Sequence, residues 1–217
     1  MVKGIIFDVD GTLLDTERIY MAAWKQAGKN AGYDIPDEVL LKTRAISTQA
    51  AHRIYKDAMG EDFNYMDLHA ERVRIAEADI AQKDDLLMPG VTDTLNWLKN
   101  QGIPMAVASS TVLEKTISHL EHAKLLHYFD AVVGGDMIEK GKPAPDIFLK
   151  AADMLGLHPE ECVVVEDSPA GIRAAFCAKM IPVLIPDCVP ENPDTKAMSA
   201  VVLDSMEQLV AFLQEVR

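Results

Sequence analysis

Hydrophobic and polar residues alternate along this chain in two patterns, one typical of strands and one typical of helices. Short apolar runs rich in β-branched and aromatic residues predict buried strands at residues 4–7, 103–108, 131–133, 162–165, 181–185 and 200–203. Apolar residues spaced three or four apart predict helices between most of these runs, at residues 91–100, 112–123, 146–155, 169–178 and 206–216. Strands that alternate with helices of about ten residues indicate an α/β fold, with a parallel sheet covered on both faces.

The stretch from residue 16 to about residue 87 shows helical spacing only. Turn signals near residues 32–36 and 60–62 divide it into three or four helices, and Met88-Pro89-Gly90 marks the return to the alternating pattern. Because the first strand belongs with the later ones, the helical stretch is an insertion. We therefore predict an α/β core domain of residues 1–15 and 88–217 and a helical domain of residues 16–87.

Composition narrows the possible partners. A net charge of −13 and a pI near 4.8 argue against nucleic acid or an anionic membrane, because both attract basic surfaces. The three cysteines form no CxxC pair, so we expect no disulfide framework and a cytoplasmic location. No secretory leader and no apolar run of about 18 residues is present, so no membrane span is expected. These features favour a cytoplasmic protein, and we expect it to be monomeric.

The first strand ends in two carboxylates, Asp8 and Asp10, followed by Gly11 and Thr12. Side chains two residues apart in extended chain point to the same side, so both carboxylates can face one cavity. Paired carboxylates repel unless a cation lies nearby, and Mg²⁺ prefers a few carboxylates together with water and substrate phosphate. An EF-hand loop is excluded because Gly11 is fourth, not sixth, when counted from Asp8. An ordinary Asp-Gly turn explains Gly11 but not the second acid.

Two other strands also end in polar residues. Ser109-Ser110-Thr111 follows the strand at 103–108 and opens the next helix, where hydroxyls and backbone N–H groups can hold a phosphate or simply cap the helix. Glu166-Asp167 follows the strand at 162–165, where acids can simply cap the next helix, but acids beside a fully apolar strand are costly to bury without a cation. Lys142 lies in a proline-rich loop just before a helix and can reach a shared site or lie in solvent. A P-loop is excluded because the spacing from Gly135 to Gly141 is wrong and Pro143 replaces the hydroxyl residue.

In this order, these motifs resemble the haloacid dehalogenase-like phosphohydrolase superfamily. The resemblance spans residue 4 to about residue 185 and implies a Rossmann-like sheet, and the helical insertion is similar to the small cap domain of one subgroup. The stretches 142–146 (KPAPD) and 166–171 (EDSPAG) are most similar to the β-phosphoglucomutase-like and sugar-phosphate phosphatase branch.

The resemblance implies a Mg²⁺-dependent reaction on a small phosphorylated metabolite such as a sugar phosphate. Asp8 would attack phosphorus to form an aspartyl-phosphate, Asp10 would act as general acid and then as general base, and Lys142 would balance the negative charge. The remaining implied roles are phosphate binding by Ser109, Ser110 and Lys142, and metal binding by Asp8, Asp10 through its carbonyl, Asp167 and Glu166 near or in the coordination sphere. Candidate substrate-binding residues of the helical domain are Thr16, Tyr20, Trp24, Lys42, Arg44, Ser47 and Arg72.

The choice between a phosphatase and a phosphosugar mutase depends on the helical domain. Tyr20 stands where the mutases carry a histidine, and Ala45-Ile46-Ser47-Thr48 stands where they carry Gly-Val-Ser-Arg. We therefore favour a phosphatase, and keep the mutase as the alternative because Arg44 or Arg53 could substitute for the missing arginine. A non-catalytic metal-binding module would not need both Asp8 and Asp10. A dehalogenase would need no Mg²⁺, which leaves Asp10 and the later acidic pair without a role.

Overall fold

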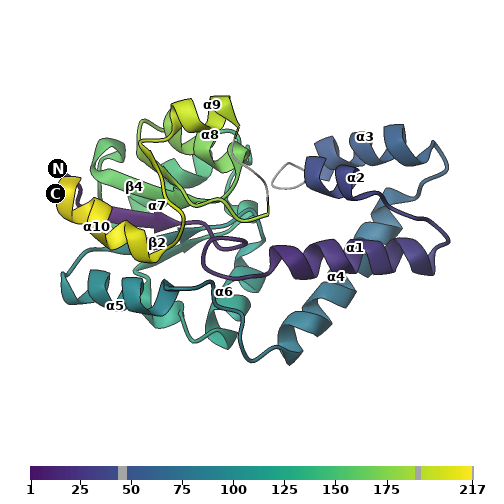
Figure 1. The fold of residues 1–217 in the computed structure, drawn as a ribbon, viewed down its shortest axis with the longest axis horizontal. Helices are drawn as coiled ribbons and strands as arrows, with labels where there is room; N and C mark the ends of the chain where they lie inside the picture. Colours follow the sequence, from purple (N-terminus) through teal and green to yellow (C-terminus); the bar gives the residue numbers. More distant parts are fainter. Residues whose placement is uncertain (44–47, 189–191, 217) are drawn as a thin grey trace. The chain divides into compact units, whose positions relative to one another are not determined.

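The computed structural model describes residues 1–43, 48–188 and 192–216, and its chain divides into two compact units (Figure 1). The core unit comprises Met1–Asp15 and Leu87–Arg217, and the helical unit comprises Thr16–Leu86. The second boundary falls one residue before the predicted one.

A six-stranded parallel sheet forms the core unit, in the order β3-β2-β1-β4-β5-β6. Its strands are β1 (Gly4–Phe7), β2 (Met105–Ala108), β3 (Ala131–Val133), β4 (Cys162–Glu166), β5 (Ile181–Leu184) and β6 (Val201–Val202). The central strand β1 pairs with β2 on one side and β4 on the other. The strand order therefore reverses between β1 and β4: β2 and β3 continue the sheet on one side, and β4, β5 and β6 continue it on the other. The predicted α/β fold is confirmed. In such sheets ligands bind beyond the carboxyl ends of the strands next to this reversal.

Helices cover both faces of the sheet. The core-unit helices are α5 (Val91–Asn100), α6 (Leu113–His122), α7 (Asp146–Leu155), α8 (Pro169–Cys177), α9 (Pro193–Met198) and α10 (Glu207–Val216), with 3₁₀ turns at Leu126–Tyr128, Gly135–Met137 and Pro159–Glu161. Ile6, Ala106 and Val164 lie side by side on neighbouring strands and pack against α7 and α8 in one buried cluster. Figure 1 shows α5 on the opposite side of the sheet from α8. The strands therefore have apolar side chains on both faces, which explains their uninterrupted hydrophobic runs.

Three strands are shorter than the hydrophobic runs that predict them. Strand β2 begins at Met105, because Pro104 has no N–H to donate, although its carbonyl still accepts a hydrogen bond from the Ile5 N–H at 3.0 Å. Ile103 is buried without being paired in the sheet. The prediction also lacked α9, a six-residue helix that Asn192 caps and Pro193 begins.

In the described residues the helical unit contains α1 (Glu17–Asn30), α2 (Asp37–Lys42), α3 (Thr48–Met59) and α4 (Tyr65–Gln82). Aromatic side chains make up much of its interior: Trp24 stacks on Tyr55 with ring centroids 4.6 Å apart, and Tyr55 stacks on Phe63 at 5.5 Å. This unit therefore has a hydrophobic core of its own. Across the described residues, no helix combines the length and apolar composition needed to cross a bilayer.

Candidate active site

The first strand delivers Asp8 to the carboxyl edge of the sheet. Its backbone N–H continues the pairing of β1 with β4 by donating to the carbonyl of Val165 at 3.0 Å. The chain then turns sharply at Gly11, whose φ of 87° is a conformation that a side chain disfavours. The N–H groups of Thr12 and Leu13 fold back onto the carbonyl of Val9 at 3.2 and 2.9 Å. The turn that the sequence shows as Asp-Gly therefore folds the chain back directly after the two acids.

Lys142 is buried and connects two carboxylates that come from different strands. Its Nζ donates to Oδ1 of Asp8 at 2.5 Å, to Oε1 of Glu166 at 2.6 Å and to the backbone carbonyl of Ala108 at 3.2 Å. These three acceptors use the three hydrogens of the ammonium group. The structure thus brings together three of the residues that the sequence predicted to share a site, and it places the lysine away from solvent.

Glu166, the last residue of β4, is held on both of its side-chain oxygens. Oε1 accepts from Lys142, and Oε2 accepts from the backbone N–H of Ser168 at 2.9 Å and from its hydroxyl at 2.8 Å. Ser168 also caps α8 by accepting a hydrogen bond from the N–H of Gly171. A Cβ on Gly171 would lie 1.8 Å from Oε1 of Glu166, so only glycine permits this approach. The structural roles of Ser168 and Gly171 were missed from the sequence, although both lie in the stretch 166–171 that carries the family resemblance.

Asp8, Glu166 and Asp167 form a buried acidic cluster, with one carboxylate oxygen from each within 4.8 Å of the others. Their exposed fractions are 6%, 1% and 3%. Burial raises the pKa of Asp8 well above its ordinary value; Lys142 opposes this rise, and Glu166 and Asp10 add to it. Burial alone would lower the pKa of Lys142, but Asp8 and Glu166 raise it above its ordinary value, which keeps the ammonium charged. The cluster has the oxygen ligands and excess negative charge that suit a divalent cation.

The loop after β2 brings hydroxyl groups to Asp10. The hydroxyls of Ser109 and Thr111 both donate to Oδ2 of Asp10, at 3.4 and 3.3 Å. Ser109 is buried, and its backbone N–H continues the sheet by donating to the carbonyl of Val133 at 3.0 Å. Ser110 is exposed next to it. The contact from Thr111 was not foreseen; the only signal was its place in a run of three hydroxyl residues.

The predicted substrate-binding residues of the helical unit have contacts within that unit. Trp24 belongs to the aromatic core, Tyr20 packs under the guanidinium of Arg72 at 4.0 Å from the ring centroid, and Thr16 is buried. Lys42 forms an ion pair with Glu38 one turn away on α2. Arg44 and Ser47 lie outside the described residues. The role of this group in substrate binding stays a prediction.

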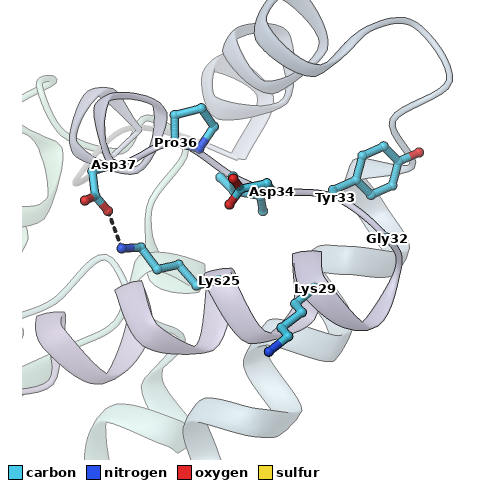
Figure 2. Close-up of a pocket in the computed structure, with 8 residues that line it drawn as sticks. Lys25, Lys29, Gly32, Tyr33, Asp34, Pro36 and Asp37 are labelled. Carbon is cyan, nitrogen blue, oxygen red and sulfur yellow. Dashed lines mark ion pairs between the residues drawn. The ribbon is translucent and has the colours of Figure 1, made fainter.

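A hollow of about 670 Å³ lies in the helical unit between the end of α1 and the segment that leads into α2. Figure 2 shows its main charges: Lys25 pairs with Asp37 at 2.5 Å, while the Lys29 side chain is directed away from Asp34 and Pro36. Because its positive charge is neutralised or directed elsewhere, this hollow has no converging set of charges comparable to the Asp8–Lys142 cluster.

Comparisons with known proteins place the chain in a family. A family model described as haloacid dehalogenase-like hydrolase matches residues 5–184. Phosphorylated carbohydrates phosphatase of Thermotoga maritima is 30% identical over 223 aligned positions, which cover 99% of this chain and 100% of that protein. Fructose-1-phosphate phosphatase YqaB of Escherichia coli is 35% identical over 179 positions, covering 82% and 93%. The crystal structure of β-phosphoglucomutase from Clostridium difficile has a TM-score of 0.84 at 26% identity, covering 99% of this chain and 96% of that one. The predicted resemblance is confirmed: the chain belongs to the haloacid dehalogenase-like hydrolase family.

Proposed function

We propose that this protein is a Mg²⁺-dependent phosphatase that hydrolyses small phosphorylated metabolites, sugar phosphates among them, through an aspartyl-phosphate on Asp8. The observation that carries the proposal is the convergence of Asp8, Lys142, Glu166 and Asp167 at the carboxyl edge of the sheet. The two relatives named above as phosphatases, which match 82% or more of the chain, support this reaction class.

The charge balance of the cluster supports a divalent cation. Three buried carboxylates face one buried ammonium, so an ionised cluster carries excess negative charge. In our proposal Asp8, Asp167 and the backbone carbonyl of Asp10 hold Mg²⁺, and Glu166, whose oxygens already accept three hydrogen bonds, acts beside the ion by fixing Lys142. The bound ion would supply positive charge that keeps Asp8 ionised and that offsets charge on the phosphoryl oxygens.

In the first step an oxygen of Asp8 attacks phosphorus, and the bond from phosphorus to the ester oxygen breaks. Asp10 donates its proton to the departing alcohol oxygen. Lys142 balances the charge of the phosphoryl oxygens, and the hydroxyl of Ser109 and the backbone N–H of Ser110 orient them.

In the second step Asp10 accepts a proton from water as the water oxygen attacks the phosphorus of the aspartyl-phosphate. Inorganic phosphate leaves and the Asp8 carboxylate is restored. Asp10 then carries the proton required for the next cycle, so protons balance over the two steps.

Selection of the substrate by the helical unit is part of the proposal. Thr16, Tyr20 and Trp24, from its first helix and the residue before it, are the candidates, together with Lys42, Arg44 and Ser47. A phosphosugar mutase remains the second candidate function, because the structurally similar protein from Clostridium difficile is named as one.

A panel assay tests the proposal. Purified protein is incubated with fructose 1-phosphate, glucose 6-phosphate, other sugar phosphates and p-nitrophenyl phosphate, with Mg²⁺ or with EDTA, and inorganic phosphate is measured. We expect release that requires Mg²⁺ and is abolished in Asp8→Asn. Turnover by Asp8→Asn, or no hydrolysis of any ester, would refute the proposal. Interconversion of sugar 1- and 6-phosphates that depends on a bisphosphate would replace it with the mutase.

A further inference from the structure

Thr111 is a second hydroxyl residue bound to the proposed acid/base carboxylate. Its Oγ1 donates to Oδ2 of Asp10 at 3.3 Å, and the Ser109 hydroxyl donates to the same oxygen at 3.4 Å. We propose that Thr111 is a positioning residue that fixes the orientation of the Asp10 carboxylate for proton transfer to the leaving group. The proposal rests on the proposed phosphatase function and adds a role for a residue that does not itself react.

The backbone of Thr111 is held in place on both sides. Its N–H donates to Oγ of Ser109 at 3.1 Å. Its carbonyl accepts from the N–H of Gly135 at 2.8 Å and from the hydroxyl of Thr116 at 3.3 Å. The Thr111 hydroxyl therefore meets Asp10 from a fixed backbone, so little conformational freedom is lost when the hydrogen bond forms.

The segment after β3, residues 134–136, packs against the loop that carries Thr111. A Cβ on Gly134 would lie 2.2 Å from the backbone nitrogen of Leu113, and a Cβ on Gly135 would lie 2.3 Å from the carbonyl oxygen of Ser110. Asp136 accepts the Leu113 N–H at 2.7 Å and so ties this segment to the start of α6. The close backbone approach, which only glycine allows, restricts movement of the loop that carries Thr111.

Two hydroxyls bound to one carboxylate oxygen restrict rotation of that carboxylate. A general acid must present its proton along the line to the oxygen it protonates, and small errors in geometry lower the rate strongly. Ser109 is also proposed to bind phosphate, whereas Thr111 is proposed only to orient Asp10. Loss of the Thr111 hydroxyl is therefore expected to weaken orientation of Asp10 while leaving Asp8 and Lys142 in place.

Substrates with different leaving groups separate orientation of the acid from a general structural role. Departure of a sugar alkoxide needs a proton, whereas p-nitrophenolate leaves without one. The ratio kcat/KM reports the steps up to the first irreversible one, which is departure of the leaving group. It therefore isolates the effect of the proton that the leaving group needs. The experiment compares kcat/KM of Thr111→Val, which keeps the shape and loses the hydroxyl, with that of Thr111→Ser, which restores the hydroxyl. The substrates are p-nitrophenyl phosphate and the sugar phosphate that the wild type hydrolyses fastest in the panel.

Thr111→Val is expected to lower kcat/KM for the sugar phosphate about tenfold or more, but less than about threefold for p-nitrophenyl phosphate. Thr111→Ser should stay within about threefold of the wild type on both substrates. Thr94→Val is the control, because Thr94, a buried threonine of the core unit, also loses a hydroxyl that donates a hydrogen bond, in its case to the carbonyl of Met206. If Thr111→Val does not fold, Thr111→Ala gives the same comparison. An equal loss on both substrates, or no loss on either, would overturn the positioning role. Absence of hydrolysis by the wild type would instead refute the phosphatase function.

Discussion

Replacing Lys142 with methionine removes the only positive charge that the described residues place against the Asp8–Glu166 pair. Methionine keeps most of the aliphatic volume, so the change mainly deletes the ammonium. Because Lys142 is 4% exposed, water cannot take over its three hydrogen bonds. Two buried carboxylates are then left without their cation.

The cost follows from breaking a buried ion pair on one side only. Such changes cost about 3–5 kcal/mol of unfolding free energy, a large part of the roughly 5–15 kcal/mol typical of folded proteins. The cost should depend on pH. Burial raises the folded-state pKa of Asp8 above its unfolded value, so protonation favours the folded state, and loss of Lys142 raises this pKa further. The deficit of the variant should therefore shrink as pH falls.

The loss of unfolding free energy in Lys142→Met is measured by urea unfolding, followed by circular dichroism, in EDTA at pH values between about 5 and 7.5. Lys140→Met is the matched control, because Lys140 lies exposed in the same loop, and its change should stay within about 0.5 kcal/mol. Combining Lys142→Met with Glu166→Gln should cost less than the sum of the single changes. A deficit below about 1 kcal/mol at neutral pH, or additive costs, would refute the reasoning.

Three further predictions concern the same site. In EDTA, Asp8→Asn should gain stability relative to the wild type as pH rises from about 4 to 7, because the raised pKa makes the ionised wild-type carboxylate costly in the fold; an opposite slope in urea titrations would contradict this. Saturating Mg²⁺ should raise the melting temperature of the wild type, and Asp167→Asn should need at least about tenfold more Mg²⁺ for the same shift in differential scanning fluorimetry; equal Mg²⁺ dependence would exclude Asp167 as a ligand. Gly171→Ala should cost about 1–3 kcal/mol of unfolding free energy in urea and lower kcat, because the added Cβ displaces Glu166. The control Gly141→Ala, whose Cβ would meet no atom within 4 Å, should change neither quantity, and equal effects of the two variants would refute the crowding argument.

The sheet and the position of the acids were predictable because each depends on local pattern. Uninterrupted apolar runs indicate strands buried on both faces, and polar residues at their carboxyl ends fall on one edge of a parallel sheet. Asp8 and the Glu166-Asp167 pair could therefore be assigned to one site before any coordinates. The family resemblance added the roles of these residues, and the family itself is confirmed.

Other features depend on contacts between distant parts of the chain, which no local pattern encodes. The hydrogen bond from Thr111 to Asp10 joins residues 101 positions apart, and Lys142 reaches Asp8 across 134 positions. Hydroxyl residues at the start of a helix are equally typical of ordinary caps, so Thr111 carried no separate signal. The predicted strands also extended too far at their ends, as at Ile103, because hydrophobicity indicates that a residue is buried and not that its backbone is paired in the sheet.

The central claim is that Asp8 becomes phosphorylated during turnover, and rapid acid quenching followed by peptide mass spectrometry tests it most directly. Wild-type protein mixed with excess substrate and Mg²⁺, and quenched within one turnover, should carry one phosphoryl group on the peptide that contains Asp8. Asp8→Asn, treated in the same way, should carry none. A phosphoryl group on another residue, or continued turnover without any phosphoryl group on that peptide, would contradict the account.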